Sequence, residues 1–247
     1  MKIIMNAPYD KNLHLKILQE AMKHSDDVVN LSPIRWLQDP LAEYKKASDW
    51  KKFEDIRKHI ESLDVVNGAE ASKLFNITFG DLGIYHITKD ISTFNASTIV
   101  SCPKYLVEKV ALSGKHLSDV IMKDAPENAK HFVRMTSVYN TSGGTVVDKL
   151  ITPDFNKAYN NADKNCATVF IPMNSRNEAY NLWASLHTKF MRYCKVKLSA
   201  NQTTPLKYLP FMPTYEHPWS DAELYKFFNL TDEEINEIEQ EIDVLLK

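Results

Sequence analysis

The stretch KIIMNAPY at residues 2–9 decides the fold. Residues 2–5 are predominantly apolar and predict the end of a buried strand, and residues 6–9 predict a polar loop that contains a proline. Apolar residues then recur with mostly helical spacing to about residue 24, and the run VVNLSP at residues 28–33 predicts a second strand that stops at its proline. Strand–helix–strand order is typical of an open α/β sheet, whose ligands bind beyond the carboxyl ends of the strands. The loop at residues 6–9 occupies such a position.

The next segment continues this pattern. Apolar spacing predicts an amphipathic helix over residues 50–63, after which residues 63–66 begin another strand. Residues 74–78 and 83–88 predict paired strands around a turn at residues 79–81. Together these elements make one half of an α/β sheet. Because only five residues precede the motif loop, we expect the other half of a doubly wound sheet to be absent.

The chain divides by pattern into three parts, residues 1–92, 93–215 and 216–247. The middle part mixes short strands and helices, with one amphipathic helix predicted over residues 176–193. The last part predicts a helical tail with many acidic residues. Two helix starts in this tail carry the capping-box pattern, Ser220 with Glu223 and Thr231 with Glu234.

The composition excludes several classes of protein. The chain has 247 residues, of which 44% are hydrophobic, enough for a sizeable core. No apolar run approaches the ~20 residues that span a bilayer, and no small-residue cleavage site follows the short apolar start. The three widely spaced cysteines indicate no disulfide framework, and the eight histidines show no metal-ligand spacing. We expect a cytoplasmic protein with no membrane partner and no bound metal.

The net charge of −2 hides a strong asymmetry along the chain. Residues 1–100 carry 13 basic against 14 acidic side chains, residues 101–215 carry 15 against 8, and residues 216–247 carry 2 against 10. A basic middle suits contact with a phosphate backbone. It is equally compatible with a well-solvated surface, so charge alone leaves both interpretations open.

Several motifs resemble one enzyme family in the same order. Asn6-Ala7-Pro8-Tyr9, after an apolar strand, resembles the Asn-Pro-Pro-Tyr motif of amino-group DNA methyltransferases. The segments ASKLFNI at residues 71–77 and GIYHI at 83–87 look like the closing hairpin of that family. The C-terminal strings are similar to the tail of large restriction–modification methyltransferases: TKF at 188–190, WSD at 219–221 and LYKFFNLT at 224–231. The resemblance covers nearly the whole chain and implies a DNA adenine-N6 methyltransferase.

The resemblance assigns roles to the loop residues. The exocyclic amine of adenine is a poor nucleophile, and the family flips the base out of the duplex into a pocket. An asparagine oxygen and a proline-loop carbonyl accept hydrogen bonds from the amine as positive charge develops, which stabilises the transition state. These roles fall on Asn6 and Ala7-Pro8, while Tyr9 and, as a second aromatic, Phe75 would stack on the base. The alternatives are a plain polar turn for Asn6 and Tyr9, and a core aromatic on a strand for Phe75.

Two departures from the family pattern matter. Ala7 replaces the first proline, which loosens the loop while keeping the carbonyl acceptor. The S-adenosylmethionine site of the family lies upstream of the motif, and this chain has no glycine-rich turn between a strand and a helix. The resemblance therefore implies a partial, Rossmann-like catalytic domain over residues 1–92, a DNA target-recognition domain over 93–215, and a helical acidic tail over 216–247.

Three hypotheses follow. The chain is a fragment or subunit of an adenine-N6 methyltransferase that is inactive alone and is completed by a second polypeptide holding the cofactor half, or by self-association. Alternatively it is a non-catalytic DNA-binding or protein-interaction remnant of such an enzyme. The third is an unrelated α/β protein with a chance motif.

The candidate contacts to double-stranded DNA lie in the basic-aromatic stretch over residues 189–197. They are Lys189, Arg192, Lys195 and Lys197. The alternative is an amphipathic helix end whose cations suit the helix dipole. The loop at residues 139–145 is a second candidate, for reading base edges, with an ordinary hairpin turn as its alternative.

Overall fold

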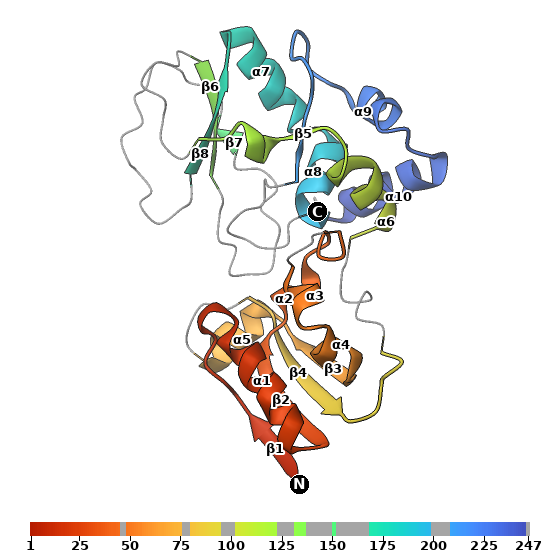
Figure 1. The fold of residues 1–247 in the computed structure, drawn as a ribbon. Coiled ribbons are helices and arrows are strands. Elements are labelled where there is room, and N and C mark those ends of the chain that lie inside the picture. The colour runs from red at the N-terminus through yellow and green to blue at the C-terminus, as the bar shows by residue number, and fades with distance from the viewer. Residues whose placement is uncertain are drawn as a thin grey trace. The chain divides into compact units, whose positions relative to one another are not determined.

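The computed structural model describes residues 1–44, 48–75, 80–94, 102–122, 131–136, 150–151, 168–198 and 208–245. The chain forms two compact units (Figure 1). The first contains Met1–Ser101, and the second contains Cys102–Asn140 and Gly144–Lys247. The predicted acidic tail at residues 216–247 thus lies in the second unit. In the described residues, no helix is both long and apolar enough to cross a membrane.

The first unit is built on a mixed sheet with helices between its strands, which is compatible with an α/β fold. Its strands are β1 (Lys2–Met5), β2 (Asp27–Pro33), β3 (Ile60–Val66) and β4 (Leu82–Thr88), in the spatial order β1-β2-β4-β3. β1 and β2 are parallel, whereas β4 is antiparallel to both β2 and β3. The strands predicted at residues 2–5, 28–33 and 83–88 are confirmed. β1 is not a buried strand, however, because Ile4 is 76% exposed.

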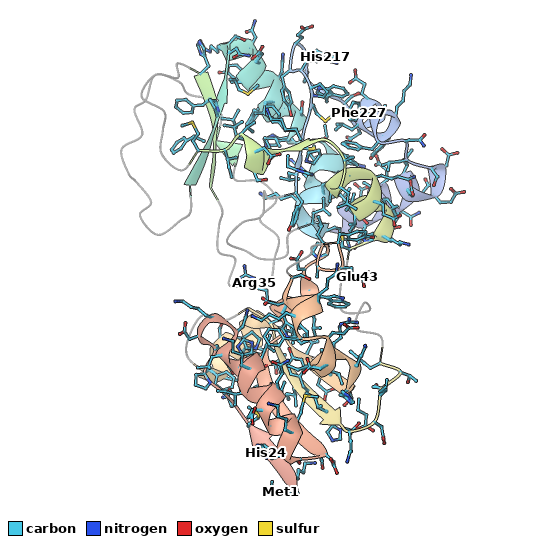
Figure 2. All side chains as sticks on the ribbon, viewed as in Figure 1. Met1, His24, Arg35, Glu43, His217 and Phe227 are labelled. Carbon is cyan, nitrogen blue, oxygen red and sulfur yellow. The ribbon has the colours of Figure 1, made fainter. Side chains whose placement is uncertain are left out.

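Helices connect the strands of the first unit. They are the turn η1 (Asp10–Asn12), α1 (Leu13–His24), α2 (Arg35–Gln38), α3 (Asp49–Lys52), α4 (Glu54–Lys58) and α5 (Gly68–Phe75). α1 runs back along the sheet, so that Met1 and His24 lie at one end of the unit and Arg35 at the other (Figure 2). The core is formed mainly by the helical face of the sheet and includes Leu15, Leu18, Val28, Ile34, Trp36, Phe53, Ile56, Ile60, Tyr85 and Ile87.

The helix predicted over residues 50–63 is wrong at its C-terminal end. It breaks at Phe53, whose φ of −110° and ψ of 37° are not helical, and it ends at Lys58. Ile60 already belongs to β3 and pairs with Ile87. The apolar spacing correctly indicated that Ile60 is buried. It did not distinguish a buried strand residue from a buried helix residue.

The predicted strand at residues 74–78 is also wrong, and so is its pairing with residues 83–88. Leu74 and Phe75 are the last residues of α5, residues 76–79 lie outside the described residues, and β4 pairs with β2 and β3 instead. The Asn67 side chain accepts a hydrogen bond from the Glu70 backbone amide at 3.0 Å, as an N-cap does. Residues 69–74 are mostly good helix formers, which favours the helix that follows.

The second unit combines short helices with two small sheets. The sheet β7 (Leu150–Ile151), β6 (His131–Thr136) and β8 (Thr168–Met173) is antiparallel, and β5 (Lys115–His116) pairs with β9 (Pro210–Phe211). The helical elements are α6 (Lys104–Leu106), the π-turn η3 (Val107–Ala111), η4 (Leu117–Asp119), α7 (Arg176–Ser185), α8 (Lys189–Lys197), α9 (Asp221–Phe227) and α10 (Asp232–Leu245).

The single helix predicted over residues 176–193 is in fact two helices. α7 ends at Ser185, and Thr188 starts α8 by accepting a hydrogen bond from the Met191 backbone amide on its side chain. Threonine competes for such backbone donors, which makes it a better cap than a helix interior residue. The capping boxes predicted in the tail are confirmed: Ser220 and Glu223 bond reciprocally, as do Thr231 and Glu234.

Candidate functional site

The motif loop (Asn6–Tyr9) lies at the carboxyl end of β1. Because β1 and β2 are parallel and Met5 pairs with Asn30, the loop is next to the end of β2 as well. Asn6 and Pro8 are exposed, Ala7 is buried and Tyr9 is half-buried. The structure thus presents the polar side chain of Asn6 to solvent at the edge of the sheet where α/β proteins bind ligands.

The Tyr9 side chain closes back over the loop. Its hydroxyl donates a hydrogen bond of 2.6 Å to Asn6 Oδ1 and lies 3.5 Å from the carbonyl oxygen of Leu31 on β2. Burial raises the pKa of Tyr9, and the hydrogen bond to Asn6 opposes this only in part. The hydroxyl is therefore a donor at neutral pH, and it occupies the oxygen that the resemblance assigns to the adenine amine.

The backbone turns sharply between the motif loop and α1. Lys11 has a φ of 40° and Asn12 a φ of 65°, both in the left-handed region. Residues other than glycine pay roughly 1–3 kcal/mol for such conformations, with asparagine at the low end. The Asn12 side chain holds the turn by donating a 2.9 Å hydrogen bond to Asp49 Oδ2. This turn brings His14, on the first turn of α1, against the ring of Tyr9.

Two polar side chains that the sequence motifs do not single out are buried beside this region. His14 is 5% exposed and Asn30 is fully buried, and in the described part of the chain His14 Nδ1 and Asn30 Oδ1 have no hydrogen-bond partner. Burial lowers the pKa of His14 and outweighs the raising effect of Asp49. The strand pattern could have identified Asn30, because residues 28, 30 and 32 share the inward face of the strand and two of them are polar.

Phe75 lies on a helix rather than on a strand. It is the last residue of α5 and is 40% exposed, so it is not a core aromatic. The alternative of a core aromatic on a strand is therefore wrong, and the assignment as a second stacking ring stays a prediction. The assignment of Asn6, Pro8 and Tyr9 does not depend on Phe75.

The predicted DNA contacts lie on α8, which packs against the acidic helix α10 of the same unit. Lys189 Nζ is 2.5 Å from Glu239 Oε2 and 3.0 Å from Asp243 Oδ1, and Lys197 pairs with Glu241. The hydrogen bonds that Lys189 donates to Glu239 and Asp243 raise the pKa of Lys189. Arg192 and Lys195 are half-buried on the same helix. Lys189 and Lys197 thus already have carboxylate partners in the free protein.

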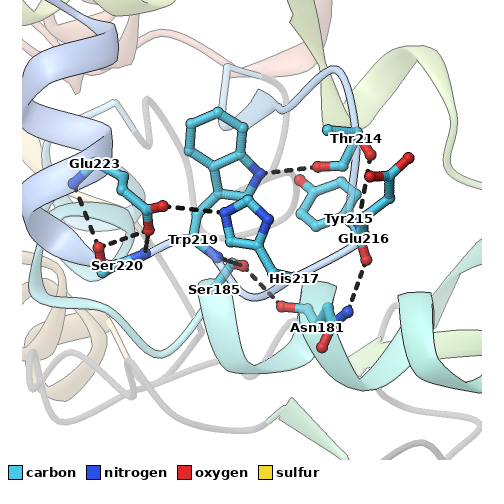
Figure 3. Close-up of polar contacts among 9 residues, drawn as sticks. All are labelled: Asn181, Ser185, Thr214, Tyr215, Glu216, His217, Trp219, Ser220 and Glu223. Atoms are coloured by element: carbon cyan, nitrogen blue, oxygen red, sulfur yellow. Dashed lines mark hydrogen bonds and ion pairs between the residues drawn. The ribbon is translucent and has the colours of Figure 1, made fainter.

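A strap at residues 214–220 ties α7 to the start of α9 (Figure 3). The Ser185 hydroxyl accepts a hydrogen bond from the Trp219 amide, and the Trp219 indole donates to the carbonyl of Thr214, both at 2.8 Å. The Glu223 carboxylate accepts hydrogen bonds from the hydroxyl and the backbone amide of Ser220, and it pairs with His217. Together these contacts lower the pKa of Glu223 to about 2. The Trp219 and Ser220 residues of the tail motif thus make structural contacts at the start of α9.

Within the described ranges no group of three metal-ligating side chains comes together. The second loop candidate, residues 139–145, lies outside the described residues. Comparison of the chain with models of protein families, with curated proteins and with solved structures gave no match.

Proposed function

We propose that this chain supplies the adenine pocket and the DNA-recognition region of a cytoplasmic, site-specific DNA adenine-N6 methyltransferase of restriction–modification type. In this proposal a second polypeptide supplies the S-adenosylmethionine half. The observation that carries the proposal is the motif loop: exposed Asn6 and Pro8 at the carboxyl end of a parallel strand.

The loop has the atoms that the reaction needs. When adenine is flipped into the pocket, Asn6 Oδ1 and the Ala7-Pro8 backbone carbonyls would accept hydrogen bonds from its amine. These acceptors favour the positive charge that develops as the amine attacks the methyl group. Tyr9 would stack on the base. S-adenosylmethionine supplies the methyl group, and no segment of this chain fits its binding motif.

The unpaired edge of the sheet supports the proposal that a second polypeptide binds there. Among the described residues β1 pairs with β2 alone, so one side of β1 keeps unpaired backbone groups. On the face opposite the core, Ile4 is 76% and Ile84 39% exposed. Parallel strands are normally covered on both faces. A half-sheet added at β1 would place the motif loop at the point where the strand order reverses, the usual ligand site of doubly wound folds.

We expect the cofactor site and the adenine pocket to lie on two different polypeptides. The isolated chain should not bind S-adenosylmethionine in calorimetry, whereas co-purification with the product of a neighbouring reading frame that carries the glycine-rich motif should yield a methylating complex. In that complex Asn6→Ala should lower the methylation rate by about 10²–10³-fold, the usual effect of removing one preorganised charge-stabilising group. Methylation is measured with labelled cofactor on mixed-sequence duplex DNA.

Lys16→Ala, at an exposed position of α1 outside the motif loop and the turn after it, is the matched control and should leave the complex assembled and active. Micromolar cofactor binding by the isolated chain would overturn the division into two polypeptides. An assembled complex that binds DNA without methylating it would favour the alternative, a non-catalytic remnant. One observation favours that alternative: the Tyr9 hydroxyl already occupies Asn6 Oδ1.

The second prediction concerns DNA binding by the second unit. The wild type should bind random duplex DNA in a salt-dependent way, and replacing Lys189, Arg192, Lys195 and Lys197 together by glutamine should weaken binding. For every phosphate that the variant no longer neutralises, the slope of log affinity against log salt should flatten by up to ~0.9. A salt titration by fluorescence anisotropy measures both the affinity and the slope.

Melting curves of the same variant distinguish a weaker DNA-binding surface from a less stable fold, because Lys189 and Lys197 also pair with α10. The double variant Lys189→Gln and Lys197→Gln should lower the melting temperature of the second unit. If the wild type fails to bind duplex DNA even at low salt, the DNA-recognition role is wrong.

A further inference from the structure

The burial of His14 carries a free-energy cost that packing of the core alone does not explain. It lies on the buried face of α1 and is 5% exposed, and its Nδ1 atom is buried without a hydrogen-bond partner in the described residues. Leaving a buried polar atom unsatisfied costs about 1–3 kcal/mol. A leucine at this position would fill the core without that penalty. A feature other than packing bulk therefore accounts for the imidazole.

The imidazole ring packs against the ring of Tyr9. The two ring centroids are 5.8 Å apart and the planes lie at 80°, an edge-to-face arrangement. Such pairs favour one relative orientation because the edge of one ring is positive and the face of the other negative. The contact is fixed from the α1 side, since the left-handed Asn12 between the two residues is anchored to Asp49.

The Tyr9 hydroxyl and the adenine amine would bond the same atom of Asn6. The hydroxyl donates to Asn6 Oδ1 at 2.6 Å. For Asn6 to accept a hydrogen bond from the adenine amine, the same oxygen must be given up by Tyr9 or shared. The edge-to-face contact with His14 orients the Tyr9 ring without using the hydroxyl, so it persists when the hydroxyl releases or shares Asn6 Oδ1.

We infer that His14 is the positioning residue of the adenine pocket: its ring holds Tyr9 edge-to-face, so that Tyr9 stays oriented when its hydroxyl releases Asn6 to the base. This inference rests on the proposed function. The buried ring is neutral at pH 7, because burial lowers its pKa more than Asp49 raises it. A neutral ring can pack against an aromatic face without bringing a charge into the core.

The test uses the full chain and a single-stranded oligonucleotide that carries one 2-aminopurine, an adenine analogue whose fluorescence falls when its ring stacks. The wild type should quench the probe, and Tyr9→Ala should abolish the quenching. His14→Leu, which keeps the bulk and loses the ring, should weaken probe binding about 2- to 10-fold, the value of an oriented aromatic pair. His14→Phe should restore it. Melting temperatures of both His14 variants serve as the folding control.

The outcomes distinguish the two ideas. Absence of quenching by the wild type, or full quenching by Tyr9→Ala, would refute the adenine pocket and with it the role of His14. Quenching that depends on Tyr9 but is the same in His14→Leu as in the wild type would leave the pocket standing and overturn the positioning role. Loss in His14→Leu without recovery in His14→Phe would also overturn it, since the aromatic ring would then not be the feature that matters.

Discussion

Replacing Gly83 by alanine should destabilise the first unit by about 1–3 kcal/mol, the range found when a packed core is overfilled. Gly83 is on β4 in the middle of the sheet. A Cβ atom there would clash with Ile34 Cγ2 and would lie 2.5 Å from Leu63 Cδ1 and 3.2 Å from the ring of Tyr85. Ile34 and Tyr85 belong to the buried core and Leu63 packs against it, so relief of these contacts requires core side chains to shift.

Thermal unfolding followed by circular dichroism measures the effect. For a unit of this size, about 4–8 °C of melting temperature is lost per kcal/mol. Gly80→Ala is the matched control, because a Cβ atom at Gly80 meets nothing within 4 Å. A melting temperature for Gly83→Ala equal to that of Gly80→Ala would contradict the packing described around β4.

Ile242→Ala should destabilise the second unit by about 2–5 kcal/mol, the cost of truncating a fully buried aliphatic side chain. Ile242 and Ile238 are both completely buried on the face of the acidic helix α10. The same helix supplies the carboxylates that pair with Lys189 and Lys197 of α8. The tail should therefore unfold together with the rest of the unit.

Denaturant unfolding would measure this if it is followed by the fluorescence of aromatic side chains on or near α8. Asn236→Ala is the control, since Asn236 is exposed on the same helix and alanine favours the helical state. If Ile242→Ala melted α10 while the remainder of the unit unfolded at its original denaturant concentration, α10 would be an independent appendage.

Local signals in the sequence predicted the elements whose identity depends on local chemistry. The strand that ends at Pro33 and the helices that begin after Ser220 and Thr231 are examples, because a proline or a capping side chain acts on its immediate neighbours. The helix over residues 50–63 was predicted too long, because apolar spacing reports which side chains are buried and not the partner that buries them. Ile60 is buried by pairing with Ile87, which is 27 positions away.

The candidate site, too, could be predicted only where it depends on local sequence. The position of Asn6, Pro8 and Tyr9 at a strand end could be predicted, since it depends on one strand and the loop after it. The contact between Tyr9 and His14 could not, because it requires the left-handed turn at residues 11–12 that Asp49 stabilises from a distant helix. The pairing of Lys189 with Glu239 joins two helices 50 residues apart, and charge totals alone give no such register.

The strand order β1-β2-β4-β3 has a consequence for synthesis of the chain. β3 is translated before β4, yet in the described sheet it is hydrogen-bonded to β4 alone. While the ribosome makes the segment between them, β1 and β2 can meet, but β3 has no strand to join. The last strand to emerge is inserted between two earlier ones and completes the sheet in a single step. The sheet is therefore completed only when β4 has been made, and a nascent chain stalled before residue 82 would carry an unpaired β3.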